Sequence, residues 1–177
     1  MINLTVFCSS KNNLHPQIYL QTEKLIKLLK YQNIKIVYGG GTNGLMGTVR
    51  KTFINLGGKV ITSNIHKFAE DGIPDDYIYD NIGDRQEKLV QLGDAYLILP
   101  GGYGTCFEML EVMTKNDIGE QTKPIFIFNC NGIFDNIIKT LEDLKSNGLI
   151  TRDLKQIKVF VSSNVDELAH QINNLIK

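Results

Sequence analysis

The chain has 177 residues, of which 42% are hydrophobic and 21% are charged, a composition typical of a soluble globular protein. Its 19 basic and 19 acidic residues balance, so no net charge favours nucleic acid or an anionic membrane, although a small anionic ligand needs only a local field. The length suits one domain with a sizeable core, and we expect a single domain over residues 1–177.

Short β-rich runs alternate with helical patterns along the whole chain. The predicted strands cover residues 2–8, 34–38, 59–63, 95–100, 124–129 and 157–161. The predicted helices cover 17–32, the segment from the glycines at 39–44 to about residue 56, 84–92, the segment from about residue 105, 134–146 and 165–176. Strands that are apolar throughout and separated by helices indicate an α/β fold: a Rossmann-like, doubly wound parallel sheet of about six strands, with helices on both faces in three layers.

Two features bear on the compartment and on metals. The N-terminal run MINLTVFCSS lacks the pattern of a signal peptide, and no stretch approaches the roughly 20 apolar residues that a bilayer crossing needs. Three scattered cysteines fit reduced thiols, and three scattered histidines show no metal-ligand spacing. We therefore expect a cytoplasmic protein without a metal site.

A first glycine-rich stretch, YGGGTNGLMG at 38–47, runs from a strand into a helix. It lacks the acidic residue that follows a dinucleotide-binding fingerprint about 20 residues later, and it lacks the Lys-Ser/Thr end of a P-loop. A tight turn that packs the helix against the sheet explains it as well as a ligand does.

A second stretch, PGGYGT at 100–105, also leads from a strand into a helix. Glycines leave backbone N–H groups bare, and the positive end of a helix favours a phosphate. Thr105 can cap the helix or donate its hydroxyl to that phosphate. Because both glycine loops follow parallel strands, they share one edge of the sheet, which favours ligand binding there.

Charged residues stand close to the second loop in the sequence. Glu108 and Glu111 are three residues apart and therefore share a helix face. Glu108 also fits a capping box with Thr105, an interpretation at least as good as catalysis. Arg85, at the start of the preceding helix, suits either a phosphate clamp or a surface salt bridge.

These motifs resemble one known family. VYGGGTNGLMG, LPGGYGTCFEMLEVMT and an Arg shortly before DAYLILPGG resemble the LONELY GUY family of cytokinin riboside 5′-monophosphate phosphoribohydrolases, whose members were often described as lysine decarboxylases. The resemblance covers most of the chain. It implies hydrolysis of an N-glycosidic bond to a free base and ribose 5-phosphate, without a cofactor, by a homodimer or an assembly of dimers.

The resemblance also assigns roles to individual residues. Arg85 and Glu108 match the catalytic pair. The implied substrate contacts are Gly40, Gly41 and Thr42 in the first loop, Gly101, Gly102, Tyr103, Gly104 and Thr105 in the second, and Glu111 and Thr114 on the following helix. In this hypothesis the 5′-phosphate rests on the second loop and the ribose extends over Glu108.

The chain departs from the family pattern at several positions. Gln86 stands where the family usually has Lys, with Lys88 as a candidate substitute, and Ser9 stands where Gly is usual. Two alternatives stay open: a broader nucleosidase acting on AMP or similar monophosphates, and a noncatalytic protein that binds or carries a nucleotide.

Overall fold

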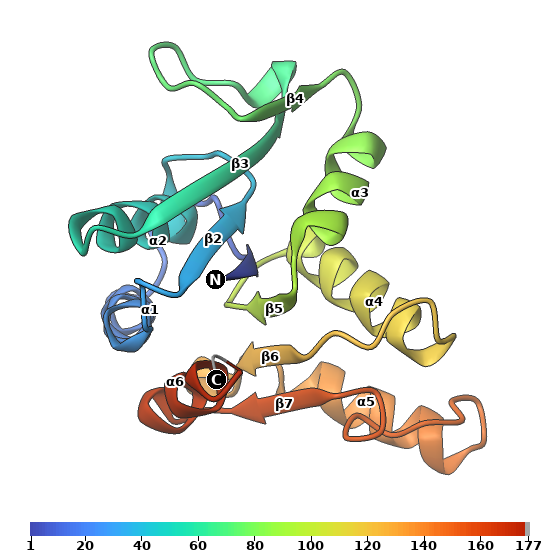
Figure 1. The fold of residues 1–177 in the computed structure, drawn as a ribbon. Helices are drawn as coiled ribbons and strands as arrows, with labels where there is room; N and C mark the ends of the chain where they lie inside the picture. Colours follow the sequence, from blue (N-terminus) through green and yellow to red (C-terminus); the bar gives the residue numbers. More distant parts are fainter. Residues whose placement is uncertain (176–177) are drawn as a thin grey trace.

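A computed structural model describes residues 1–175, which form one seven-stranded parallel sheet (Figure 1). The strand order across the sheet is β4-β3-β2-β1-β5-β6-β7. The strands are β1 (Ile2–Phe7), β2 (Ile34–Tyr38), β3 (Lys59–Ile65), β4 (Tyr77–Tyr79), β5 (Ala95–Ile98), β6 (Ile125–Phe128) and β7 (Val159–Ser162). All neighbouring pairs are parallel, so the carboxyl ends of the strands meet at one edge.

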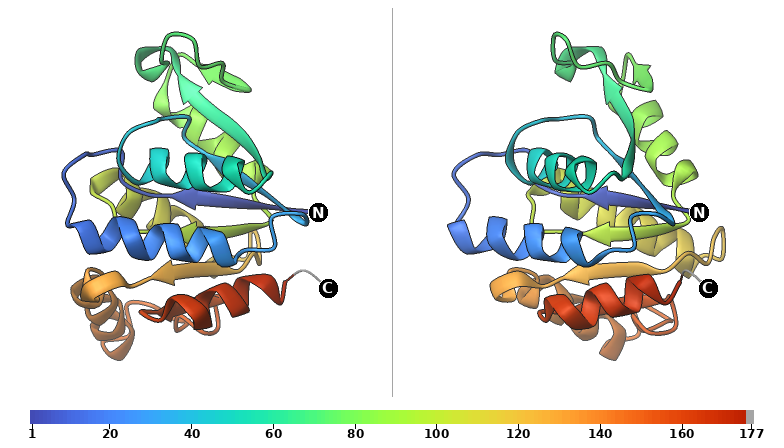
Figure 2. Two further views of the ribbon diagram at one scale, coloured as in Figure 1. Left: turned by 90° about the vertical axis from the view of Figure 1, so that its left-hand side faces the viewer. Right: turned by 60° about the vertical axis from the view of Figure 1, so that its left-hand side comes forward.

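Helices cover both faces of this sheet (Figures 1 and 2). One face carries α1 (Pro16–Leu28), α2 (Gly44–Asn55) and α6 (Val165–Asn173), and the other carries α3 (Ile82–Leu92), α4 (Tyr103–Asp117) and α5 (Asp135–Ser146). Two short 3₁₀ turns, His66–Phe68 and Cys130–Gly132, follow β3 and β6. The doubly wound, three-layered α/β fold is therefore confirmed.

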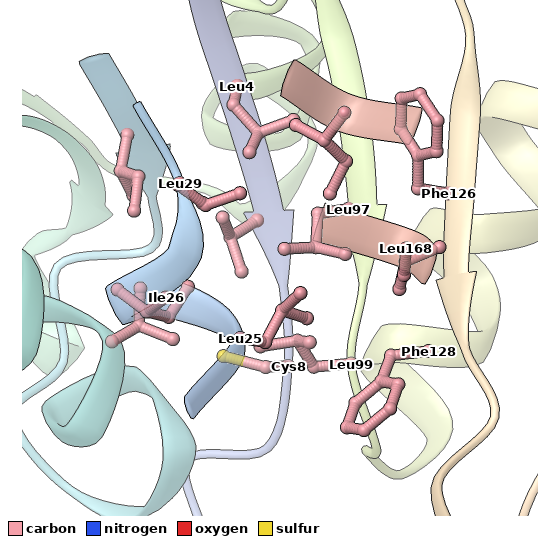
Figure 3. Packing of buried hydrophobic residues seen from close by; sticks show 14 of the residues in the cluster. Leu4, Cys8, Leu25, Ile26, Leu29, Leu97, Leu99, Phe126, Phe128 and Leu168 are labelled. Atoms are coloured by element: carbon pink, nitrogen blue, oxygen red, sulfur yellow. The ribbon is translucent and has the colours of Figure 1, made fainter. Parts of the chain in front are cut away.

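The double cover explains why the strands are apolar throughout. Successive side chains of a strand point to opposite faces of the sheet. In β5 and just after it, Leu97 and Leu99 pack toward α1 and α6, and Figure 3 shows them beside Leu25, Leu168 and Phe128. Tyr96 and Ile98 lie in the second cluster, under α3 and α4. A sheet with one wet face would have kept polar residues at half of these positions.

The six predicted strands are confirmed, and the differences have local causes. The seventh strand, β4, lies between the predicted strand at 59–63 and the predicted helix at 84–92, and it was missed because it is three residues long and half exposed. The first helix ends at Leu28 rather than near residue 32, because Leu29 turns to an extended conformation. The last helix ends at Asn173, and residue 176 of the predicted helix lies outside the described residues.

The strand order reverses between β1 and β5, which places a topological switch point between them. In open α/β sheets, ligands bind beyond the carboxyl ends of the strands at this point. Within residues 1–175, none of the helices has both the length and the apolar character needed to cross a bilayer.

Candidate active site

The loops after β1, β2 and β5 are tied together at the switch point by the main chain of Ser9. Its carbonyl accepts hydrogen bonds from Leu45 N at 2.9 Å and Met46 N at 3.3 Å, at the start of α2. Its N–H donates to Pro100 O, 3.1 Å away, at the end of β5. The backbone of Ser9 therefore fixes the two glycine loops relative to each other, and its hydroxyl adds a contact that a Gly would lack, by accepting from Lys11 N at 3.0 Å.

A buried ion pair lies behind this edge. Arg85 Nη1, on α3, donates to Glu108 Oε1, on α4, at 3.1 Å. The two residues are only 9% and 6% exposed, so the pair is not a surface salt bridge. The structure thus brings together the two residues predicted to be catalytic, which stand 23 positions apart in the chain.

The position of Arg85 is fixed by two further contacts. Its Nε donates to Ser63 O, at 3.1 Å, and the Ser63 hydroxyl donates back to the Arg85 carbonyl at 3.3 Å. The guanidinium also lies directly against Gly39, where any Cβ would overlap Nη2. Gly39 and Ser63 were not among the predicted site residues, although Gly39 carried a usable signal as the first glycine after β2.

The surroundings of Glu108 shift the pKa of its carboxyl toward neutral pH. Burial raises the pKa of its carboxyl to about 7, although Arg85 opposes this shift, and the charge of nearby Glu111 adds to it. General acids and bases work best when their pKa lies near the operating pH. The Cys8 thiol comes close to the same pair, but burial raises its pKa, and Figure 3 shows it packed with Leu25 and Leu99.

The capping-box interpretation of Glu108 is wrong. The helix α4 begins at Tyr103, not near Thr105, so Gly102 is the N-cap and Thr105 lies inside the first turn. Among the described residues, no side chain caps this helix end. The Glu108 carboxylate instead pairs with Arg85 across the helix–helix contact.

Glu111 has its own partner on α3. Gln86 Nε2 donates to Glu111 Oε2 at 3.0 Å, and Gln86 is only 4% exposed. Lys88 does not replace the missing cation, since its Nζ lies 4.3 Å from the centroid of the Tyr77 ring. Thr114 is not brought to the pair either: its hydroxyl donates to Leu110 O at 2.8 Å, and its side chain lines a groove toward α5.

The loop at 100–105 presents an open surface next to the pair. Apart from the adjacent residues and the backbone of the same helix, a Cβ at Gly102 or Gly104 would meet no heavy atom of the described chain within 4 Å, and Tyr103 is 97% exposed. Gly101 differs, because Thr105 packs against it. An uncapped helix N-terminus with open glycines leaves N–H groups and the positive end of the helix dipole free for an anion.

The loop at 39–44 is filled by the chain itself. Thr42 N donates to Glu70 Oε1 at 3.0 Å, and the Thr42 hydroxyl donates to the other carboxylate oxygen. Gly40, at φ +85°, is covered by Asp75 and Asn64, where a side chain at position 40 would collide. Glu70 stands 28 residues from Thr42, so no local sequence signal indicated this contact. A Cβ at Gly41 would lie 3.2 Å from Met46 Sδ, so protein groups lie against all three of the predicted contacts Gly40, Gly41 and Thr42.

The side chains that could bind a metal ion are scattered. Over residues 1–175, no three His, Cys, Asp or Glu side chains converge in an arrangement that could hold a metal ion. This edge of the sheet does bring the buried Arg85–Glu108 pair near the N-terminal end of α4.

Comparisons with known proteins bear on this geometry. A family model described as "Possible lysine decarboxylase" matches residues 46–172. A probable cytokinin riboside 5′-monophosphate phosphoribohydrolase, LOG4 of Oryza sativa subsp. japonica, is 30% identical over 93% of this chain and 74% of its own length. The cytokinin riboside 5′-monophosphate phosphoribohydrolase of Rhodococcoides fascians is 28% identical, over 84% of this chain and 78% of its own.

Solved structures support the fold. The molybdenum cofactor carrier protein of Chlamydomonas reinhardtii superposes with a TM-score of 0.74 at 16% identity, over 99% of this chain and 98% of its own. At that level of identity the likeness concerns the fold alone.

Proposed function

The chain belongs to the LONELY GUY family, and we propose that it hydrolyses the N-glycosidic bond of a purine riboside 5′-monophosphate, giving the free base and ribose 5-phosphate. The observation that carries the proposal is the buried Arg85–Glu108 pair beside the open loop at 100–105. The names of relatives at about 30% identity support the same class of reaction.

The geometry suggests how such a substrate would lie. The 5′-phosphate would rest on the N–H groups that begin α4, where the helix dipole favours negative charge. Glu108 and Glu111 follow on the same helix, about one and two turns further on, and therefore would lie under the ribose rather than under the phosphate. The glycines at 102 and 104 and the carboxylate at 108 thus serve different parts of one ligand.

The proposed step is the addition of water across the bond between C1′ and the base nitrogen. The hydroxyl goes to C1′ and the proton goes to the departing base. Positive charge develops at C1′ and the ring oxygen, and a fixed carboxylate such as Glu108 stabilises it and takes the proton of the attacking water. Arg85 holds the Glu108 carboxylate in place through its Nη1. Glu111 has one oxygen bonded to Gln86, and its other oxygen can accept from a ribose hydroxyl.

The decisive experiment is a substitution of Glu108. We expect Glu108→Gln to lower turnover roughly 10²–10⁴-fold while nucleotide affinity is retained, because the amide keeps the shape but cannot accept the proton. The measurement is the release of free base and ribose 5-phosphate from AMP and from its N6-isopentenyl analogue. Glu23→Gln, at an exposed salt bridge on α1, is the matched control. Unchanged turnover in Glu108→Gln would remove Glu108 from the mechanism.

Comparing two substrates in the same assay determines which base the protein prefers. The relatives are named for cytokinin riboside 5′-monophosphates, and we propose that this chain hydrolyses the N6-isopentenyl nucleotide in preference to AMP. Equal rates on both would instead indicate a broader nucleoside monophosphate hydrolase.

A noncatalytic carrier is the second candidate, favoured by the fold likeness to the molybdenum cofactor carrier protein of Chlamydomonas. An open anion site can hold a phosphorylated ligand without cleaving it. Binding of AMP with no release of base by the unmodified protein would support this candidate.

We also propose a homodimer, on the strength of an apolar stripe on α4. Tyr103, Phe107, Leu110 and Ile118 share one helix face and are all exposed. The stripe borders a groove of about 390 Å³ between α4 and α5. Exposed apolar patches of this kind mark interaction surfaces. Light scattering of the protein in solution would give the mass of the assembly.

A further inference from the structure

The contact between α3 and α4 contains two parallel polar pairs rather than one. Adjacent residues of α3, Arg85 and Gln86, donate to Glu108 and Glu111, which are one turn apart on α4. The donor–acceptor distances are nearly equal, 3.1 and 3.0 Å. The first pair is an ion pair. The second joins a neutral amide to a carboxylate.

The burial of Gln86 sets it apart from an ordinary surface glutamine. It is 4% exposed, and its amide nitrogen donates across the helix contact to Glu111. On the same helix, Gln91 makes the common kind of bond, to exposed Glu87 one turn away, at 2.9 Å. A buried amide whose donor points at a carboxylate fixes that carboxylate in one orientation, since a buried polar group left without a partner is costly.

We propose that Gln86 is a positioning residue, which holds Glu111 toward the ribose and, being uncharged, leaves the negative charge of Glu111 to act on Glu108. This inference rests on the proposed function for its substrate. The hydrogen bond uses Oε2 of Glu111, so Oε1 remains to receive a ribose hydroxyl. Selectivity for a sugar over a bare phosphate would then depend on an amide that never touches the substrate itself.

The charges around Glu108 support the proposal that the negative charge of Glu111 acts on Glu108. Arg85 faces it from α3 and favours its ionised form, whereas Glu111 on α4 disfavours it, and Cys8 approaches from the end of β1. Burial and Glu111 together raise the pKa of Glu108, against Arg85. A cation at position 86 would cancel part of the Glu111 charge and lower that pKa.

The charge of Glu111 is offset only in part by a neighbouring cation, since the pKa of Lys115 is raised mainly by its hydrogen bond to Glu120 and less by the charge of Glu111. Lys115 follows it by one turn on α4, but its ammonium is bonded to Glu120 at 2.5 Å. Tyr96, on β5, is neutral, because burial raises the pKa of its phenol. Among the described residues, the hydrogen-bond donor that reaches the Glu111 carboxylate is the Gln86 amide.

Two substitutions separate the two roles of Gln86. Gln86→Leu removes the donor, and we expect KM for the nucleotide to rise roughly tenfold, because Glu111 loses its fixed orientation. Gln86→Lys keeps a donor and adds a charge, and we expect the pH at which Glu108 titrates to fall by about one unit. The matched control is Gln91→Leu, which removes an exposed amide from the same helix.

The titration is read by ¹³C NMR of carboxyl-labelled glutamate, with Glu108 assigned by its loss in Glu108→Gln. The rising limb of the pH–activity profile should move to lower pH with it in Gln86→Lys, which a merely structural role would not produce. An unmoved Glu108 titration in Gln86→Lys, or an unchanged KM in Gln86→Leu, would overturn the proposal. Because the NMR titration requires no turnover, absence of hydrolysis by the unmodified protein would refute the proposed function separately.

Discussion

The glycine loop after β2 is filled by side chains of its own chain, whereas the loop after β5 is open. At 39–44, the Arg85 guanidinium lies on Gly39, Asp75 covers Gly40, and Glu70 occupies the donors of Thr42. At 100–105, apart from the adjacent residues and the backbone of the same helix, no heavy atom of residues 1–175 lies within 4 Å of a Cβ added at Gly102 or Gly104. The two loops share an edge and are joined through Ser9, so the difference lies in what they accommodate.

This difference separates two uses of glycine. In the first loop, the missing side chains make room for charged groups that build the site, above all Arg85. In the second, they leave open space beside the backbone, where we propose that a ligand binds. The carboxylates nearby follow the same division: hydrogen bonds from Thr42 lower the pKa of Glu70, whereas burial raises the pKa of Glu108 to about 7.

The two loops should differ most in their response to substitution of Gly44, the first residue of α2, and Gly104, the second residue of α4. Gly44 has φ +58°, and a Cβ there would lie 2.5 Å from the Lys11 carbonyl oxygen, so Gly44→Ala must strain or move the backbone. We expect it to lower the free energy of unfolding by about 3 kcal/mol. Gly104→Ala, with open space around it, should be neutral or stabilise by up to about 1 kcal/mol. Urea denaturation of both variants tests this, and equal losses would show that the two loops are packed alike.

A second pair of substitutions separates placement of the catalytic pair from ligand binding. Gly39→Ala would displace the Arg85 guanidinium, whose flexible end can move, so the fold should survive while kcat/KM falls about 100-fold. Gly102→Ala places a methyl in the open loop and should raise KM with a smaller change in kcat. Steady-state kinetics on AMP distinguishes the two. Full activity in Gly39→Ala would mean that the position of Arg85 is not needed.

The sequence predicted more of the fold than of the candidate site. Apolar strands and amphipathic helices predict a covered parallel sheet because both patterns follow from local geometry and burial. The short edge strand β4 was not predicted, since three half-exposed residues show no distinctive periodicity of hydrophobic residues. Helix ends were off by a few residues where one backbone angle decides them, as at Leu29.

For the site, the sequence identified residue types but not their partners. Glu108 and Arg85 stood out only with the help of the family resemblance, because the same Thr105-x-x-Glu108 spacing also fits a capping box. Contacts between distant segments, such as Glu70 with Thr42, depend on how the chain returns to the sheet edge. Glycine spacing alone could not distinguish a loop that binds a ligand from one that makes room for Arg85.

The raised pKa of Glu108 predicts that the stability of the protein depends on pH near the open loop. A carboxyl whose pKa rises from 4.5 to about 7 on folding binds its proton more tightly in the folded state. Its contribution to stability is therefore fully present below about pH 4.5 and is lost as pH rises through about 7. Relative to Glu108→Gln, the free energy of unfolding should fall on the order of 2 kcal/mol between pH 5 and pH 8. A flat difference, measured by urea denaturation at both pH values, would mean that Glu108 is solvated.

Glu70, at the filled loop, should show the opposite slope with a smaller amplitude. Its pKa is lowered by Thr42, so its contribution is present above its usual pKa and is lost as pH falls through the lowered value. Glu70→Gln keeps an acceptor for the Thr42 N–H but loses the charge, and we expect the free energy of unfolding to fall by about 1 kcal/mol at pH 7, a difference that disappears in acid.

Glu23→Gln, at an exposed salt bridge with Lys27, serves as the control and should change stability by less than about 0.5 kcal/mol. If Glu70→Gln and Glu108→Gln shift stability with the same pH slope, the two carboxylates do not differ as the two loops do. Opposite pH slopes for the two variants would confirm that the carboxylate at the filled loop is stabilised in its charged form and that the one near the open loop is stabilised in its neutral form.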